Sequence, residues 1–520
     1  MDWQTDILVI GTGIAGCSAA LAAARNGASV LLITGSNDPL DSNTAYAQGG
    51  IVTRGVNDSS TQLAEDILQA GAGLCHPAAV QFLAENGPAI VERLLVKELG
   101  VEFSKGPDGI FDITEEAAHS MPRILHADDL TGRAIIVRLL DAVRAESRIT
   151  IKTGCLAVDL LNISDHSANR LDIYRSPACV GAYVFETATG EIHTVTAQET
   201  ILATGGLGQI YLHTSNPTVA RGDGIALAYR IGARLLNLEY IQFHPTTLYH
   251  RDADSYLLTE SMRGEGARLV NARGEEFMKT IHPLGSLAPR DIVARGILNE
   301  MLRSGRPCVY LDITHKDAEW TRNRFPNIYQ TCKQFHIDIT SDLIPVVPAE
   351  HYSCGGVAAD LNGCTNIARL RAVGEVSCTG LHGANRLAST SLLEGLLWGW
   401  QAGSKASETA LSKASRIEIP PIRPFVAQSE PVDPALIVQD WLSIQYTMWN
   451  YVGLSRTVRR MERAMSILRE LQREIFVFYR KARPGESVLS LRNGITTALA
   501  VLFAAQRNHS SCGCHHLQED

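Results

Sequence analysis

The order of apolar and polar residues predicts a parallel-sheet unit at the start of the chain. An apolar run occupies residues 7–10, a glycine-rich turn follows at residues 11–16, and small residues then continue to residue 26. A second apolar segment covers residues 29–33. Short continuous apolar runs are typical of buried parallel strands. The pattern therefore predicts a strand, a turn, a helix and a second strand.

The spacing of apolar residues changes several times further along. Residues 61–100 and the segment from residue 133 have helical spacing, whereas residues 150–198 predict a β-meander inserted in the first domain. Residues 200–206 predict another buried strand that ends in a glycine turn. Proline, arginine and histidine become frequent over residues 236–345, where we expect the long strands to stop and a separate domain to be inserted. A strand at residues 370–373 then returns the chain to the first domain.

Five prolines within residues 417–434 predict a linker before three C-terminal helices. The first helix begins at Asp433, an N-cap followed by proline, with Leu436, Trp441 and Ile444 facing inward. The second runs from Ser455 with Val458 on its apolar face, and the third covers residues 489–502. We predict three domains: residues 1–235 with 346–416, residues 236–345, and residues 417–520.

The glycine turn has the spacing of a dinucleotide-binding site. Gly11 permits a tight turn, Gly13 lets a pyrophosphate approach the backbone, and Gly16 lets the helix pack closely on the sheet. Free N–H groups at the helix start face the phosphates in such sites. The acidic residue that binds the ribose of NAD is missing, because residues 34–36 are Thr-Gly-Ser, which weakens a plain NAD interpretation. The expected contacts are Gly11, Thr12, Gly13, Ile14, Ala15 and Gly16.

Composition and charge exclude several classes of protein. The 520 residues are 45% hydrophobic and 20% charged, which is typical of a soluble globular protein. The net charge of −8 argues against a nucleic-acid surface. No apolar run reaches the length of about 18 residues needed to span a membrane, and no signal peptide precedes the first strand. Eleven scattered cysteines without a CxxC pair favour a reducing compartment, so we expect a cytoplasmic protein.

Several polar segments allow two interpretations. Residues 41–50 are either a surface loop or a loop pressed against a cofactor. Residues 114–132 are rich in ionisable groups and suit a solvated loop, with Thr131 as the cap of the next helix. Asp223 either balances the charge at a helix start or contacts the cofactor. Cys512, Cys514 and His515 form a tail that suits a frayed terminus better than a metal site, so no metal is predicted.

Six motifs, in order, resemble the succinate dehydrogenase/fumarate reductase flavoprotein family over nearly the whole chain. They are the glycine turn at 11–16, Ala-Gln-Gly-Gly at 47–50, Ala-Thr-Gly-Gly at 203–206, the paired motifs at 244–246 and 259–266, Arg290-Asp291, and His-Gly-Ala-Asn-Arg at 382–386. The resemblance implies FAD in a Rossmann-like α/β domain, with an inserted α+β capping domain and a C-terminal three-helix domain. Membrane-complex members attach FAD covalently to a histidine where this chain has Asn43, so we expect non-covalent binding. Glu116 and His119 match an element of the aspartate-oxidising members.

The resemblance also assigns residues to roles. Those expected beside FAD are Asn43, Thr44, Ala45, Tyr46, Ala47, Gln48, Gly49, Gly50, Asp223, Glu375, Ser391 and Leu392. Those expected around a C4 dicarboxylate are Glu116, Gln242, His244, Thr259, His351 and Arg386. Arg290 matches the proton donor of related enzymes, and Glu260 with Arg263 matches its relay.

The implied chemistry is flavin-dependent oxidation of L-aspartate to iminoaspartate. Each arginine guanidinium can donate two parallel hydrogen bonds to one of the two substrate carboxylates. By the resemblance, the electrons pass to oxygen, giving hydrogen peroxide, or to fumarate, giving succinate, and quinolinate synthase takes iminoaspartate toward NAD. Two alternatives remain open, a soluble fumarate reductase and a flavoprotein subunit that acts only when docked to an iron–sulfur partner. The motifs leave the physiological electron acceptor and the oligomeric state open.

Overall fold

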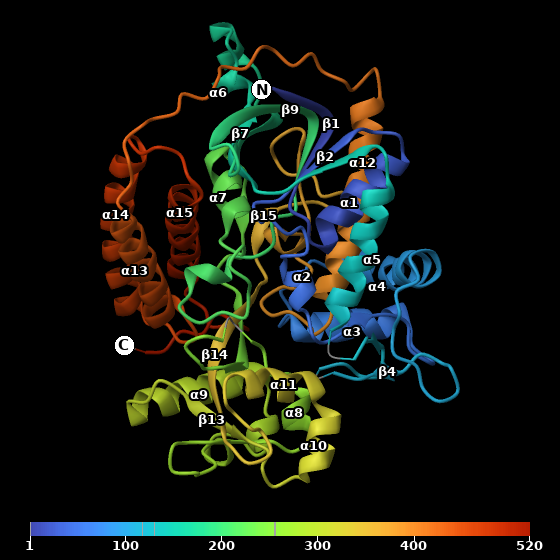
Figure 1. The fold of residues 1–520 in the computed structure, drawn as a ribbon, viewed down its shortest axis with the longest axis vertical. Helices are drawn as coiled ribbons and strands as arrows, with labels where there is room; N and C mark the ends of the chain where they lie inside the picture. The colour runs from blue at the N-terminus through green and yellow to red at the C-terminus, as the bar shows by residue number, and fades with distance from the viewer. Residues whose placement is uncertain (1, 117, 129, 254–255, 520) are drawn as a thin grey trace.

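The computed structural model describes residues 2–116, 118–128, 130–253 and 256–519. Residues 1, 117, 129, 254, 255 and 520, which fall within predicted segments, lie outside the described residues. Figure 1 shows an upper α/β part, a lower part that includes β13 (Val309–Asp312), and a group of helices beside the upper part that ends the chain. This arrangement confirms the predicted fold class.

A seven-stranded sheet forms the centre of the upper part. Its members are β1 (Trp3–Ile10), β2 (Val30–Ile33), β6 (Ile149–Lys152), β7 (Cys155–Asn162), β8 (Cys179–Glu186), β9 (Glu191–Leu202) and β16 (Leu370–Ala372). The strand order is β6-β2-β1-β9-β8-β7, and β16 pairs with β9. Neighbours from β6 to β9 are parallel, as are β16 and β9, while β7, β8 and β9 are antiparallel. The predicted meander is therefore a continuation of the main sheet.

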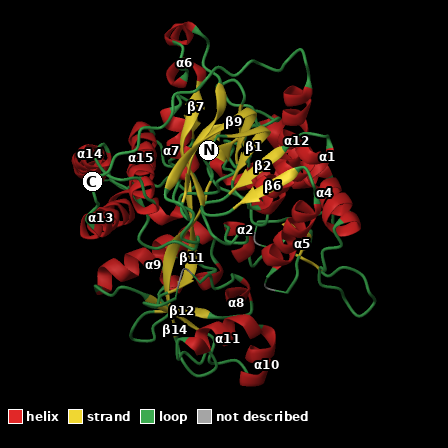
Figure 2. Ribbon diagram, turned by 45° about the horizontal axis from the view of Figure 1, so that its top comes forward, coloured by secondary structure: helices red, strands yellow, loops and turns green. Residues whose placement is uncertain are grey.

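Alternate residues of β1 face two different cores. Ile7 and Val9 pack with α1 (Ile14–Arg25) and α12 (Ser391–Leu411), whereas Leu8 and Ile10 belong to the core that includes α7 (Asp223–Arg230) and the C-terminal helices. Figure 2 shows α1 and α12 on one side of the strands and α7 on the other. A strand buried on both faces reads as a continuous apolar run, which explains the pattern at residues 7–10.

The predicted helical segment at 61–100 is confirmed. It forms α3 (Ser60–Ala70), α4 (Pro77–Ile90) and a π-helix at Val91–Glu98. α5 (Thr131–Ala145) begins two residues earlier than expected. The prediction that Thr131 caps it is wrong, because its hydroxyl donates to the Gly49 carbonyl oxygen at 2.6 Å and accepts from the Ala127 N–H at 2.9 Å. Thr131 thus ties α5 to the 41–50 segment.

The lower part contains a four-stranded antiparallel sheet, so the expectation that long strands stop after residue 236 is wrong. The order is β11-β14-β13-β12, with β11 (Ile241–Leu248), β12 (Arg268–Val270) and β14 (Ile344–Ser353). Pro245 and two register shifts interrupt β11, which hides its alternation in the sequence. Around the sheet lie α8 (Ser261–Gly264), α9 (Arg290–Ser304), α10 (Ala318–Arg324) and α11 (Pro326–Gln334). The predicted boundary at 345/346 falls inside β14, and the domain limits stay a prediction.

Three long helices follow the proline-rich segment: α13 (Pro434–Val452), α14 (Val458–Tyr479) and α15 (Glu486–Arg507). Asp433 caps α13 by accepting from the Ala435 N–H at 2.9 Å, as predicted. Leu436 and Val458 were expected to face inward but are 52% and 51% exposed, because each lies in the first turn of its helix, beyond the packed region. Within the described residues, α15 alone is long and apolar enough to cross a membrane, and most of it is buried in the protein.

Candidate active site

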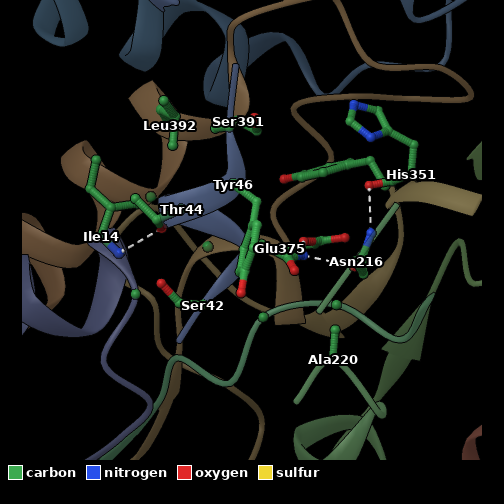
Figure 3. A pocket seen from close by; sticks show the side chains of 18 of the residues that line it. Ile14, Ser42, Thr44, Tyr46, Asn216, Ala220, His351, Glu375, Ser391 and Leu392 are labelled. Atoms are coloured by element: carbon green, nitrogen blue, oxygen red, sulfur yellow. Dashed lines mark hydrogen bonds between the residues drawn. The ribbon is translucent and has the colours of Figure 1, made fainter. Parts of the chain in front are cut away.

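A cavity of about 520 Å³ lies where the upper and lower parts meet. Its wall combines the glycine turn, the 41–50 segment, the start of α12 and residues of the lower sheet. Figure 3 shows Ile14, Thr44, Ser391 and Leu392 on one side of it and Asn216 and His351 on the other. Four segments that are separate in the sequence therefore line one cavity.

The glycine turn forms the end of the cavity at the start of α1. Gly11 has φ +115°, and a Cβ there would lie 2.1 Å from the Ala203 carbonyl oxygen, so only glycine fits. Gly13 is more open, since the nearest neighbour of a Cβ at that position would be the Thr44 hydroxyl, at 3.3 Å. Thr44 in turn accepts the Ile14 N–H at 3.0 Å. The start of this helix is thus open to the cavity at Gly13, as a pyrophosphate requires.

Several buried side-chain atoms in the wall have no hydrogen-bond partner among the described residues. They include Thr12 Oγ1, Asn43 Oδ1, Gln48 Oε1 and Thr204 Oγ1. Unpaired buried polar atoms are costly unless a bound group satisfies them. Together with the glycine turn they fit a ligand with many donors and acceptors along its length, as FAD has.

Asn43 and Glu375 form a polar pair in the middle of the wall. The Asn43 amide donates to Glu375 Oε2 at 3.1 Å and to Asn216 Oδ1 at 2.7 Å. Glu375 also accepts the Ser353 N–H at 3.1 Å. Burial raises the pKa of Glu375 to about 7. An amide at position 43 cannot form the covalent flavin bond that a histidine forms.

The remaining residues expected beside FAD also lie in the wall, except Ala45 and Gly16; Gly16 instead packs against the turn, where a Cβ would lie 1.9 Å from the Gly11 carbonyl oxygen. Asp223 begins α7 and accepts from the Asn493 amide at 2.8 Å, so it contacts the C-terminal helices as well as the cavity. Ser391 and Leu392 begin α12, whose unpaired N–H groups give this end a partial positive charge. The Tyr46 side chain projects between Thr44 and Glu375 in Figure 3.

Arg290 and Glu260 meet on the lower side of the cavity. Arg290 begins α9, and its Nε donates to Glu260 Oε2. Burial opposes the charge of both groups, but the Glu260 and Glu116 charges raise the pKa of Arg290, and the arginines lower that of Glu260. Arg263 lies behind Glu260 at 3.6 Å and does not line the cavity. Glu260 therefore contacts both arginines.

Arg386 is buried and faces the cavity from the loop before α12. Its Nη2 donates to Gln242 Oε1 at 2.9 Å, and its Nε has no partner among the described residues. Burial lowers the pKa of Arg386. Gln242 lies behind Arg386 and does not line the cavity, since its amide donates to Asn385 Oδ1 and the Arg386 carbonyl. Its placement suits holding Arg386 better than touching a substrate.

Two uncharged histidines lie between the arginines. The rings of His244 and His351 are 5.5 Å apart. Burial lowers the pKa of each histidine well below its usual range. A neighbouring positive charge is the second cause, that of Arg290 for His244 and that of Arg386 for His351. His244 Nδ1 accepts the Thr246 N–H at 3.2 Å, which leaves its Nε2 proton as a donor. Thr259 lines the same side. These groups add hydrogen bonds without adding positive charge.

Glu116 lies in the cavity wall and not in a solvated loop. Its Oε2 accepts from the Ser389 hydroxyl at 2.6 Å, and the neighbouring Glu115 is more exposed. Both acids border the cavity. His119 is buried and does not line the cavity itself, but its ring lies 3.0 Å from the carbonyl oxygen of Ala388, which does. The segment therefore places a carboxylate opposite the arginines.

Several residues of the wall were not predicted from the sequence. Asn216, Tyr352 and Ser389 contact predicted site residues, yet none was assigned a role. Tyr352 directly follows His351, so its place in a strand end beside a site residue was the available signal. Asn216 lies in a loop and had no such signal.

Comparisons with known proteins agree with the resemblance. A sequence model of the FAD binding domain family matches residues 6–392. The chain is 41% identical over 519 residues to an L-aspartate oxidase of Yersinia pestis, covering 98% of this chain and 95% of that protein. Identity to an L-aspartate oxidase of Halobacterium salinarum is 42% over 522 residues, covering 99% and 97%. A solved E. coli quinol fumarate reductase FrdA superposes with a TM-score of 0.85 and 27% identity, covering 100% of this chain and 92% of that chain.

Proposed function

The chain belongs to the L-aspartate oxidases of the FAD-binding flavoprotein family, and we propose that it oxidises L-aspartate to iminoaspartate in the cavity described above. The observation that carries this proposal is the arrangement of Arg290 and Arg386 around one cavity with Glu116. Two guanidinium groups match two carboxylates, and the acid matches the ammonium group of aspartate. Succinate and fumarate have no group for the acid to bind.

The cofactor is FAD, and the glycine turn, the 43–50 segment, Asp223, Glu375 and the start of α12 would hold it. When bound, FAD would supply the acceptor for the hydride that leaves Cα of the substrate. The protein's own residues bind and orient the substrate. Arg290 and Arg386 hold the carboxylates, and His244 donates from Nε2. Glu116 orients the amine, while Thr259 and His351 complete the wall.

Glu260 and Arg263 would serve Arg290 when a proton has to be delivered in the reverse direction, to fumarate. An arginine is a weak acid because its pKa lies above about 12. The direct bond from Arg290 Nε to Glu260 supplies the contact through which a proton could be returned to it. We therefore propose oxygen and fumarate as alternative electron acceptors, giving hydrogen peroxide and succinate.

Iminoaspartate is consumed, in this proposal, by quinolinate synthase in the synthesis of NAD. We propose the cytoplasm as the site of action. All eleven cysteines are free thiols, which supports a reducing compartment.

Anaerobic reduction of the bound flavin tests the proposal. The flavin-loaded protein is mixed with L-aspartate, D-aspartate or succinate, and the visible absorption of the flavin is followed. We expect L-aspartate to bleach it and the other two to leave it oxidised. Bleaching by succinate alone would overturn the proposal.

A second candidate, a soluble fumarate reductase, is favoured by the Arg290–Glu260–Arg263 arrangement and by the similarity to FrdA. Fumarate reduction in a protein that L-aspartate does not reduce would support it. A third, a flavoprotein subunit that requires an iron–sulfur partner, would be excluded by turnover of the isolated chain.

A further inference from the structure

A buried hydrogen-bonded cluster extends from the cavity wall, which Tyr352 lines, into the protein behind it. It consists of Tyr352 at the end of β14, Glu394 on α12 and His382 in the loop that leads to Arg386, and we call it the Tyr352 cluster. The Tyr352 hydroxyl donates to Glu394 Oε2 at 2.6 Å, and His382 Nε2 lies 3.0 Å from the same oxygen. The three residues are 5%, 2% and 4% exposed. A buried carboxylate is thus held by two side-chain donors.

The Tyr352 ring supports Arg386 directly. The Arg386 Cζ lies 4.5 Å from the centre of the ring, within the range of a cation–π contact. No carboxylate among the described residues lies within ion-pair distance of Arg386. Its other contacts are the neutral Gln242 oxygen at 2.9 Å, and Ser391 and the Leu387 carbonyl at 3.4 Å. The face of Tyr352 therefore offers a negative surface to this guanidinium, and the Glu375 carboxyl group is a further acidic group near it.

This arrangement compensates the positive charge of the buried Arg386 side chain. A buried arginine needs negative charge nearby, but a carboxylate bonded to it would occupy the donors that the substrate requires. Glu394 lies one ring away and bonds to the hydroxyl of Tyr352. Its charge draws the phenolic proton and makes the ring more negative, which strengthens a cation–π contact. The charge of Arg386 is compensated while its donors stay available.

We propose that Tyr352 is a positioning residue for the substrate carboxylate, and that Glu394 acts through it to hold Arg386 ready to bind. This inference rests on the proposed function. His382 keeps the Glu394 carboxylate in place from the other side. None of the three residues has to touch the reacting atoms.

Two conservative variants test the proposal in the flavin-loaded enzyme. Tyr352→Phe keeps the ring and removes the hydroxyl, and Glu394→Gln keeps the shape and removes the charge. We expect each to raise KM about threefold to tenfold for both L-aspartate and fumarate, with a smaller change in kcat, because Arg386 binds a carboxylate common to both. The double variant should be no worse than the worse single variant, since both changes break one connection.

Tyr211→Phe is the matched control. Tyr211 is fully buried, its hydroxyl bonds to the Val452 carbonyl at 3.4 Å, and it does not line the cavity. Its KM values should match those of the wild type. Unchanged KM values in Tyr352→Phe would overturn the inference, as would additive effects in the double variant. If Glu394→Gln does not fold, the KM values of Tyr352→Phe still decide. Absence of aspartate turnover in the wild type would instead count against the proposed function.

Discussion

In the proposed function, single residues decide how the cavity distinguishes aspartate from other dicarboxylates. Arg290 and Arg386 attract any dicarboxylate and repel an ammonium group. Glu116 is the half-buried acid that borders the same cavity, and its bond to Ser389 fixes its orientation. In the proposed function, discrimination between aspartate and fumarate therefore depends on the Glu116 carboxylate.

We predict that Glu116→Gln lowers kcat/KM for L-aspartate about tenfold or more, the loss expected for one charged hydrogen bond, and changes fumarate reduction little. Both activities are measured on one preparation with matched FAD content. Glu115→Gln is the control, because Glu115 is adjacent in the chain, carries the same charge and is more exposed. Equal losses in the two reactions would show that Glu116 supports the loop and not the amine.

Asn43 predicts that FAD is released when the protein is denatured. Its amide bonds to Glu375 and Asn216 and has no chemistry for attachment to the flavin. Acid precipitation should leave the yellow colour in the supernatant. Flavin that stays in the washed pellet would contradict this prediction.

Glu375 predicts a pH dependence of stability. Burial raises its pKa from 4.5 to about 7, so between these values the folded protein keeps a proton that the unfolded chain releases. The free energy of unfolding should therefore fall as pH rises through this window. In the flavin-free protein, Glu375→Gln removes the effect and should be more stable than the wild type at pH ~8, by an amount on the order of 3 kcal/mol. At pH ~4 the carboxyl group is mostly protonated in both the folded and the unfolded wild type, so the two proteins should no longer differ in stability for this reason. Denaturant unfolding at both pH values measures the difference, and an identical difference at both would refute the assignment.

At the scale of elements, the short helix α2 (Asn43–Tyr46) depends on α5 for its place. Gly132, in the first turn of α5, donates its N–H to the Ala47 carbonyl at 3.0 Å. A Cβ at Gly132 would lie 1.8 Å from the Thr44 carbonyl oxygen, which is backbone and cannot rotate away. The contact between the two helices fixes the segment that is expected to hold FAD.

Gly132→Ala should therefore weaken FAD retention and destabilise the protein by about 1–3 kcal/mol or more, as overpacking does. Flavin content after gel filtration and thermal unfolding measure the two effects. Gly485→Ser is a suitable control, because a Cβ there meets nothing within 4 Å. Normal flavin content in Gly132→Ala would show that α2 can move without losing the cofactor.

At the scale of the whole molecule, the C-terminal tail connects the last helices to the substrate site. It was expected to be frayed, but Cys514 donates its N–H to the Ala384 carbonyl at 2.9 Å and its thiol to Asn385 Oδ1 at 3.2 Å. Asn385 also accepts from Gln242, which holds Arg386. His515 is buried beside Arg456, with 2.6 Å between Nδ1 and Nη1. Contacts with distant parts of the chain order this segment. The local sequence pattern does not predict these contacts.

Removal of residues 511–520 should lower kcat/KM for L-aspartate and fumarate together and destabilise the protein by about 1–3 kcal/mol, because Arg456 and Asn385 lose buried partners. A chain that ends at Gln518 keeps these contacts and serves as the control. Steady-state kinetics and thermal unfolding of the two shortened proteins provide the comparison. Full activity without residues 511–520 would show that the tail has no influence on Arg386.

The sequence by itself determined the parallel sheet, the glycine turn and the C-terminal helices. These features depend on local rules: apolar runs buried on both faces of a sheet, glycine where the backbone needs φ +115°, and the cap at Asp433. Each is decided by residues within a few positions of one another. The family motifs added the cofactor and the substrate class.

Only the tertiary structure decided which polar groups meet. It placed Gln242 behind Arg386, 144 positions away, and Glu116 against Ser389, 273 positions away. It also joined Tyr352 to Glu394 across a strand end and a helix. The periodicity of a segment reports which side of it is buried, but not which other segment covers that side. The partners of a buried polar group follow from the packing of whole elements, and that packing exists only in the folded chain.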